Sequence, residues 1–538
     1  MAAKDKKRGT FVIQAAVLAS ASLIVRFIGF LYRMPLTDLI GDTGNAIYSG
    51  GYYIYTFLLI LSSAGLPAAI SRLVSVRRVR GEYVNAHKVF EISMAFAGTL
   101  GAIGMVALFL FAEEVAVMVE QPESVYCLRT LAPTLFIVGI MSVYRGYLQG
   151  MDIMTPTAVS QIFEQLFNAV FSVLLAWILV KQSIAMGAAG GTAGTGIGAL
   201  VGLIIIMVYY FKERRKIFRE MRYERRGIRH ETNGQILLSI ITTAVPIIAG
   251  TAIFSITNII DTKMVKSGLM ASGAFTQSQA DVLYGQLSGK YVTLTTLPVS
   301  ISSAMATAAI PNIAASVAAG DRRRIKSKIN LALKLAMVVA IPSAFGIGIL
   351  GDNILLMLFP KYPDGGILLK AGAVSIAFLS LCQIVTGELQ GIGKIHIPVI
   401  GALLGAIAKV ILNALLIKNP QINVVGAVIS TDACYFVAAI FNLIMLSRIT
   451  GVRPYYGQII VKPVLCSIVM SIGCLGSYKL FNIFAGNTIS TLLSIIVAMA
   501  IYLVSMLLIN GITEKDLRSI PKGRTMIRLF KRMGLMRI

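Results

Sequence analysis

The chain has 538 residues, of which 56% are hydrophobic and only 14% are charged, and its mean hydropathy is +0.79. This composition excludes an ordinary soluble protein and indicates a protein that crosses a membrane many times. The formal net charge of +25 is concentrated in short segments between hydrophobic stretches, so it predicts membrane orientation and argues against nucleic-acid binding.

Apolar stretches of about twenty residues recur along the chain and predict an all-α polytopic membrane protein with about fourteen transmembrane helices. The first stretch is long and contains arginines, so we expect a retained span rather than a cleaved signal peptide. The predicted spans are 11–39, 47–71, 88–111, 126–149, 158–181, 187–211, 235–260, 287–311, 329–350, 367–389, 396–418, 424–446, 459–482 and 488–510.

Basic residues cluster in alternate connections between these spans. Because basic connections face the cytoplasm, and an even number of spans places every cluster on one side, we expect both termini in the cytoplasm. The clusters are 4–8, 72–80, 212–229, 322–328, 448–453 and 515–537.

Two short motifs recur in the two halves of the chain. The stretch Gly-Tyr-Leu-Gln-Gly at 146–150 recurs as Gly-Glu-Leu-Gln-Gly at 387–391, and the stretch 66–71 recurs loosely at 297–302. The match is imperfect, because Gly150 lies 18 positions before Asn168 whereas Gly391 lies 22 before Asn413. The repeat predicts two six-helix lobes in the same orientation, followed by two extra C-terminal helices.

The predicted domains follow from that repeat. They are an N-terminal lobe at 1–211, a basic cytoplasmic linker at 212–234, a C-terminal lobe at 235–450, and helices 13 and 14 with a basic tail at 451–538. For the basic linker, a solvated connection is favoured over an anchor for anionic lipids.

Arg26 and Arg33 lie inside the first predicted span. An arginine near the bilayer centre costs about 2.5–3.5 kcal/mol, so two on one helix indicate a wet or anionic surrounding. Seven residues make almost two turns, which places both side chains on one helix face about 10 Å apart along the axis. We expect them to bind a bulky anion, with the larger role for Arg26 because Arg33 lies nearer the helix end. Snorkelling to an interface, or pairing with a buried carboxylate, is the alternative.

Other polar residues inside predicted spans are weaker candidates. Glu164 and Asn168 share one helix face, as do Lys409 and Asn413, and each pair fits either a substrate cavity or hydrogen bonding between packed helices. Lys290, at the entry of the eighth span, is a further candidate for substrate binding, with interface snorkelling as the alternative.

Asp261 and Glu388, at the ends of two spans, are candidates for ion coupling or gating. For Asp261, snorkelling to an interface is the favoured alternative. Arg145 is expected to mark a cytoplasmic helix end, and Lys334 to snorkel from the ninth span.

Signatures of an enzyme are scarce. His87, His230 and His396 all fall at predicted span ends or in connections, where a solvated role is expected. No nucleotide-binding loop, metal-ligand spacing or disulfide pattern is present in the sequence, so no metal or cofactor is expected and any coupling ion is unspecified. The glycine-rich stretch 187–198 lacks the P-loop lysine and predicts close helix packing.

Four elements in order resemble a known family. They are 25–33 (Val-Arg-Phe-Ile-Gly-Phe-Leu-Tyr-Arg), 65–74 (Gly-Leu-Pro-Ala-Ala-Ile-Ser-Arg-Leu-Val), Gly81-Glu82 and 148–150 (Leu-Gln-Gly). The chain resembles the polysaccharide-transporter branch of the multidrug/oligosaccharidyl-lipid/polysaccharide exporter superfamily, and within it the stage V sporulation B group and the MurJ-type lipid II flippases. The resemblance extends over essentially the whole chain.

This resemblance implies a monomeric flippase, not an enzyme, in the cytoplasmic membrane of a bacterium. It implies that an undecaprenyl-pyrophosphate-linked cell-wall precursor crosses by alternating access, for peptidoglycan or spore cortex synthesis, with membrane lipids as the other partners. Helices 1, 2, 7 and 8 would line a cationic cavity, and helices 13 and 14 would form a groove for the lipid tail.

Two departures favour the sporulation-type group over MurJ. The second span lacks an arginine between Tyr52 and Ser63, and no acid follows Lys290 before Pro298.

Three other functions remain as alternatives. A drug or cation antiporter of the same superfamily would need carboxylates facing its cavity, but the first span offers none before Asp38. A membrane glycosyltransferase or ligase would need a large outward loop with catalytic groups. Only a transport assay would distinguish the flippase from an assembly scaffold without transport activity.

Overall fold

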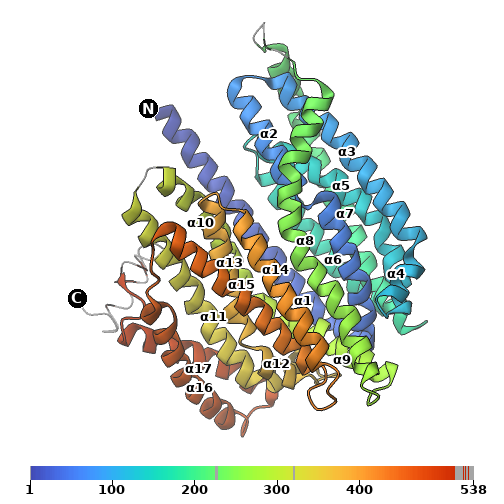
Figure 1. Ribbon diagram of the computed structural model, residues 1–538, viewed down its shortest axis with the longest axis vertical. Coiled ribbons are helices and arrows are strands. Elements are labelled where there is room, and N and C mark those ends of the chain that lie inside the picture. The colour runs from blue at the N-terminus through green and yellow to red at the C-terminus, as the bar shows by residue number, and fades with distance from the viewer. Residues whose placement is uncertain are drawn as a thin grey trace. The chain divides into compact units, whose positions relative to one another are not determined.

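The computed structural model describes residues 2–224, 228, 230–318 and 321–514, together with 516, 525, 527, 528 and 531 (Figure 1). The regular secondary structure of these residues is helical, with no strand among them. The chain is therefore an all-α membrane protein, as its composition predicts. Two compact units are present, Met1–Gly289 and Lys290–Ile538.

The first unit contains nine α-helices, a π-helical turn and a 3₁₀ turn. They are α1 (Ala2–Leu59), η1 (Ile60–Ala64), α2 (Leu66–Arg80), α3 (Tyr83–Leu110), α4 (Ala112–Met118), η2 (Pro122–Ser124), α5 (Val125–Gly150), α6 (Thr155–Leu179), α7 (Ile184–Arg222), α8 (Asn233–Ala271) and α9 (Gln277–Gly285). A π-helical segment, η3 (Gln286–Tyr291), contains the division between the units.

The second unit contains eight α-helices and one π-helical turn. They are α10 (Val292–Ala318), α11 (Arg322–Leu358), α12 (Gly366–Gly372), α13 (Ser375–Gly391), α14 (His396–Leu416), α15 (Val425–Thr450), η4 (Gly457–Val461), α16 (Lys462–Phe481) and α17 (Asn487–Leu508).

The long helix α1 folds back on itself at Gly41. The backbone there has φ 69° and ψ −174°, a left-handed φ that glycine adopts without steric cost. Fifteen residues of straight helix would separate Arg33 from Tyr48 by about 22 Å along the axis. The Arg33 guanidinium nevertheless lies 4.3 Å from the Tyr48 ring centroid. The first limb of α1 thus contains the predicted span 11–39. The second limb begins the predicted span 47–71, which continues through η1 into α2.

Membrane-length helices number ten among the described residues, or eleven if α12 and α13, bent by 49°, form one span. One of the ten, Ser20–Arg80, has 61 residues. A helix of that length extends about 90 Å, three times the hydrocarbon thickness, and the fold at Gly41 divides it. The exact number of fourteen spans stays a prediction.

Glycines bring α6 and α7 into close contact. A Cβ atom at Gly190 would lie 2.6 Å from the carbonyl oxygen of Leu175, and one at Gly198 would lie 2.4 Å from that of Glu164. Only glycine permits this approach, because any side chain would overlap the facing backbone. The predicted packing role of the stretch 187–198 is confirmed.

The segment between α7 and α8 differs from the predicted linker. Helix α7 continues without a break to Arg222, past the expected end at residue 211. Helix α8 contacts α1, α2, α3 and α9, and so belongs to the first compact unit. The compact units therefore divide later in the chain than the predicted lobes, because contact with earlier helices holds α8 in the first unit. The division into repeat-related lobes at 1–211 and 235–450 stays a proposal.

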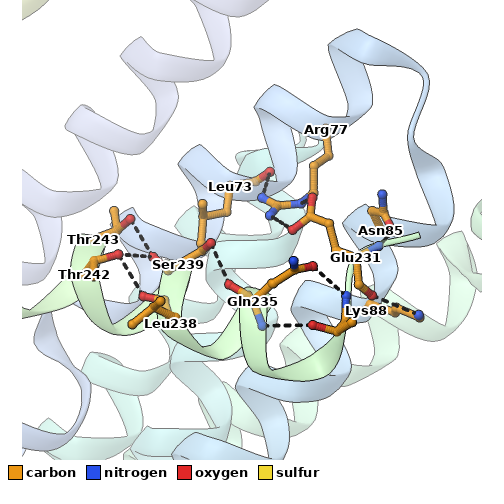
Figure 2. A network of polar contacts seen from close by, with 11 residues as sticks. Leu73, Arg77, Asn85, Lys88, Glu231, Gln235, Leu238, Ser239, Thr242 and Thr243 are labelled. Carbon is orange, nitrogen blue, oxygen red and sulfur yellow. Dashed lines mark hydrogen bonds and ion pairs between the residues drawn. The ribbon is translucent and has the colours of Figure 1, made fainter. Parts of the chain in front are cut away.

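Glu231 ties the start of α8 to α2 and α3 (Figure 2). Its carboxylate accepts hydrogen bonds of 2.9 and 2.5 Å from Nε and Nη2 of Arg77, a bidentate ion pair. Its backbone N–H donates to Asn85, and its carbonyl accepts from Lys88. A capping box between Thr232 and Gln235 then begins α8. This connection is therefore anchored to the first unit at a defined point.

Candidate substrate site

Arg33 is held against two aromatic rings. Its guanidinium lies over the Tyr48 ring at 4.3 Å and within 6.0 Å of the Tyr52 ring, and the two rings stack with centroids 5.5 Å apart. Its Nη1 atom is buried and has no hydrogen-bond acceptor among the described residues. Cation–π contacts leave the N–H groups at the guanidinium edge available to an anion.

Arg26 lies two turns earlier on the same limb of α1 and is exposed. The two arginines share a helix face by their spacing, but only Arg33 has aromatic rings against its guanidinium. Their common role in binding an anion stays a prediction. The surroundings of the two side chains favour Arg33 over Arg26 as the main anion-binding residue.

Glu164, on α6, forms an ion pair within the first unit. Arg145 of α5 donates from Nη2 to Glu164 Oε2 at 2.7 Å and to Ser160 Oγ at 2.7 Å. The side chains of Arg145 and Glu164 are 12% and 28% exposed, so the pair is mostly withdrawn from solvent. Arg145, five residues before the end of α5 at Gly150, is therefore the counter-ion of Glu164.

Asn168 lies one turn further along α6 and is buried at the contact with α7. Its Oδ1 atom is 2.9 Å from Ser172 Oγ and 3.5 Å from Thr195 Oγ1. A Cβ at Gly198 would lie 3.0 Å from the Asn168 side chain. These contacts favour the hydrogen-bonded packing role for Asn168.

Lys409 and Asn413 are almost fully buried on α14, with exposures of 3% and 1%. They continue a buried stripe that begins with Gly401 and Gly405, which pack against α15 at Asn442 and Cys434. Both side chains interact with neighbouring groups. The role of Lys409 and Asn413 in a substrate cavity stays a prediction.

Lys290 is buried, with 1% exposure, where the second unit begins. Its ammonium group donates a hydrogen bond of 3.0 Å to the carbonyl oxygen of Asp364. A side chain held in this way is not snorkelling to an interface.

The two candidates for ion coupling have different environments. Asp261 on α8 is half-buried and interacts with neighbouring groups. Glu388 on α13 is fully buried, and neither of its carboxylate oxygens has a hydrogen-bond partner among the described residues. An isolated buried carboxylate is costly in its ionised form, so Glu388 is suited to binding a proton or a cation.

Lys334 is buried and paired, contrary to the expected snorkelling. Its ammonium lies 2.6 Å from Asp516, beyond the last span, and its side chain is only 6% exposed. Although burial opposes ionisation, hydrogen bonds from Lys334 and Thr513 lower the pKa of Asp516 below its ordinary value. Lys334 thus fixes the chain after α17 to α11 instead of snorkelling.

His87 is also buried, contrary to the expected solvated role. Its Nδ1 atom lies 3.1 Å from the hydroxyl of Tyr147, and its ring stacks on Phe90 at 5.6 Å. His230 and His396 are exposed. In the described part of the chain, no group of three or more His, Cys, Asp and Glu side chains could hold a metal ion.

Several partners in the site have no distinctive local signal in the sequence. Tyr48 and Tyr52 lie four residues apart in the second limb of α1, a spacing that is equally typical of core packing. Arg145 carries no local signal for its partner, because Glu164 lies on another helix. Only the tertiary structure brings these groups to Arg33 and Glu164.

Comparison with known proteins extends this description. Residues 12–317 match the family model described as "Polysaccharide biosynthesis protein". The lipid II flippase MurJ of Bacillus subtilis (strain 168) is 29% identical over 484 residues, covering 86% of each chain. Stage V sporulation protein B of the same organism is 24% identical, covering 96% of this chain and 99% of that protein.

A solved structure titled "Lipid II flippase MurJ, inward closed conformation" has the same fold. Its TM-score is 0.65 at 14% sequence identity, and the match covers 91% of this chain and 98% of that chain. The protein is a polytopic membrane transporter and not an enzyme. It belongs to the polysaccharide biosynthesis protein family, in the polysaccharide-transporter branch of the exporter superfamily.

Proposed function

We propose that the protein is a flippase for a lipid-linked oligosaccharide, and that its substrate is an undecaprenyl-pyrophosphate-linked cell-wall precursor similar to lipid II. The observation that carries the proposal is the arginine pair on α1. The Arg33 guanidinium lies over the Tyr48 ring, and its buried Nη1 atom has no acceptor in the described part of the chain. The named activity of the MurJ relative supports the same substrate class.

The chemistry of the headgroup explains the need for arginine. A pyrophosphate cannot cross hydrocarbon unaided, because its charge loses the hydration that stabilises it. A planar guanidinium replaces that hydration through two parallel, charge-assisted hydrogen bonds to phosphate oxygens. The prenyl tail can stay in lipid while the headgroup moves past these groups.

The remaining residues receive supporting roles in this proposal. Arg26 contacts the headgroup from the exposed part of α1, and Lys290 contributes a second fixed cation. The α6 pair, Glu164 and Asn168, and the α14 pair, Lys409 and Asn413, shape the helices around the path.

Glu388 and Asp261 are the proposed coupling or gating groups. The fully buried carboxyl of Glu388 takes up a proton or a cation during the cycle.

The cellular setting completes the proposal. The chain works as a monomeric unit in the cytoplasmic membrane of a bacterium, with both termini in the cytoplasm. It serves peptidoglycan or spore cortex synthesis and moves its substrate outward by alternating access.

Transport into proteoliposomes with labelled prenyl-pyrophosphate glycolipids tests the proposal. Arg33→Ala should reduce flipping at least tenfold, and Arg33→Lys should retain a fraction because ammonium lacks the bidentate fork. Arg26→Ala should show a smaller loss. Arg80→Ala, which removes an exposed arginine at the end of α2, is the matched control and should leave transport unchanged.

Two results would contradict the proposal. Wild-type flipping by Arg33→Ala at equal membrane abundance would remove the arginine mechanism. Efflux of organic cations with no glycolipid movement by the wild-type protein would favour the antiporter.

A further inference from the structure

The last three turns of α7 have two chemically distinct faces. One face carries Phe211, Phe218 and four arginines at the helical spacing i, i+3, i+4, i+7, i+8 and i+11, and all six side chains are exposed. We call these six residues the arginine face; its arginines are Arg214, Arg215, Arg219 and Arg222. The opposite face carries Glu213, Ile217, Glu220 and Glu224.

The acidic face is already occupied within the protein. Glu220 forms an ion pair of 2.8 Å with Arg78, and Glu224 accepts a hydrogen bond of 2.5 Å from the backbone N–H of Val84. Ile217 between them is buried, with 2% exposure. The end of α2 and the start of α3 therefore cover this side of α7, and Arg78 pairs with one of its acids.

The arginine face has no such partner. None of its four arginines forms an ion pair with a described residue. Together with Tyr223, the face lines a groove of about 770 Å³. Arg214 lies over the Phe218 ring at 5.3 Å, which holds its guanidinium plane in place. Four positive charges and exposed aromatic rings therefore border one hollow.

The length of α7 places this groove at a membrane surface. Its 39 residues extend about 58 Å, whereas the hydrocarbon core is about 30 Å thick and the bilayer with its headgroups is about 40–45 Å thick. The apolar part of α7 lies at its N-terminal end, so the last turns emerge at headgroup level or just beyond. Phosphate is the anion available there, and the guanidinium fork matches its geometry.

We propose that the arginine face of α7 binds the phosphate headgroups of anionic phospholipids in the leaflet where α7 emerges. For these residues, the groove and the absence of an ion pair with a described residue favour the lipid anchor over the solvated connection expected from the sequence. The exposed phenylalanine rings reach the acyl-chain boundary while the arginines hold the phosphates. The site is separate from the substrate arginines of α1 and does not depend on the flippase activity.

Lipid binding to the detergent-solubilised full chain, measured by native mass spectrometry, tests this site. Wild-type protein should bind phosphatidylglycerol at least tenfold more tightly than phosphatidylcholine. The triple variant R215Q/R219Q/R222Q should lose that preference at least tenfold. Because these side chains are exposed and unpaired among the described residues, its melting temperature should match that of the wild type.

A control with the same charge change separates a site from general attraction. The variant R322Q/R323Q/K328Q removes three exposed cations from the start of α11 and should change phosphatidylglycerol binding less than twofold. Replacing the three α7 arginines by lysine should weaken binding about threefold. Equal losses in the two glutamine variants, or full binding by the lysine variant, would overturn the site in favour of nonspecific charge.

Competition identifies the occupant. Undecaprenyl phosphate at equal concentration should not displace phosphatidylglycerol from the wild-type protein. If undecaprenyl phosphate displaces bound phosphatidylglycerol at least tenfold more effectively than added phosphatidylglycerol does, the phospholipid assignment is wrong. The site would then bind a prenyl-phosphate lipid.

Discussion

Helix α5 of the first unit and helix α13 of the second carry the same short glycine motif. The two units differ in how the buried charged groups near the motif are paired. At Gly146, a Cβ atom would lie 2.9 Å from the Cα and carbonyl oxygen of Pro67. At Gly387, it would lie 2.9 Å from the Cβ and carbonyl oxygen of Ala306. Both motifs thus use a glycine to bring an earlier helix into backbone contact.

The residues beside these glycines differ. In the first unit, Arg145 precedes Gly146 and neutralises Glu164, and Tyr147 follows it and bonds to His87. In the second unit, Thr386 and Glu388 flank Gly387, and Glu388 has no hydrogen-bond partner among the described residues. One scaffold therefore holds a compensated ion pair, and the other holds a carboxyl group that can change its protonation or bind a cation.

The strongest test of the shared scaffold is to add a methyl group at each glycine. Gly146→Ala and Gly387→Ala should each destabilise the protein by about 2–3 kcal/mol, because the new Cβ meets backbone that cannot move aside. Unfolding in a denaturing detergent titration measures the effect. Gly98→Ala, at a helical glycine with open space around its Cβ position, should cost nothing. If Gly146→Ala lowers the stability and Gly387→Ala does not, the two motifs are not structurally equivalent.

A smaller effect is expected from breaking the ion pair of the first unit. Arg145→Met should cost about 2 kcal/mol, less than a fully buried pair because Glu164 is 28% exposed. The double variant Arg145→Met/Glu164→Gln should recover part of that loss, since no unpaired charge remains. Arg129→Met, which breaks the exposed pair with Glu113, should cost below about 1 kcal/mol. Additive losses in the double variant would show that the two side chains do not compensate each other.

Replacing Glu388 should change the free energy of unfolding least, and it tests the transport function most directly. Glu388→Gln should preserve or slightly raise stability, because it removes a carboxyl without a described partner, and should slow transport about tenfold, or about 1.4 kcal/mol. Tyr147→Phe is the control at the matching position and should cost about 1 kcal/mol of stability while transport continues. Transport by Glu388→Gln at the wild-type rate, with the same response to a proton gradient, would remove Glu388 from coupling.

Much of the architecture followed from local chemistry. Hydrophobic length predicted helical spans, and the glycine pattern at 187–198 predicted close packing, because each property depends on residues near one another in the chain. The arginines of α1 stood out for the same reason, since an apolar stretch makes a charge conspicuous.

The tertiary structure alone decided which polar groups meet. Arg145 and Glu164 lie on different helices, Tyr48 reaches Arg33 only because α1 folds back at Gly41, and Lys334 meets Asp516 from a segment beyond the last span. Sequence spacing reports neighbours along one helix, whereas these contacts depend on how helices fold back and pack. The hydrophobic pattern therefore determined that this protein occupies a membrane, and the packing of its helices decided which charges meet and pair.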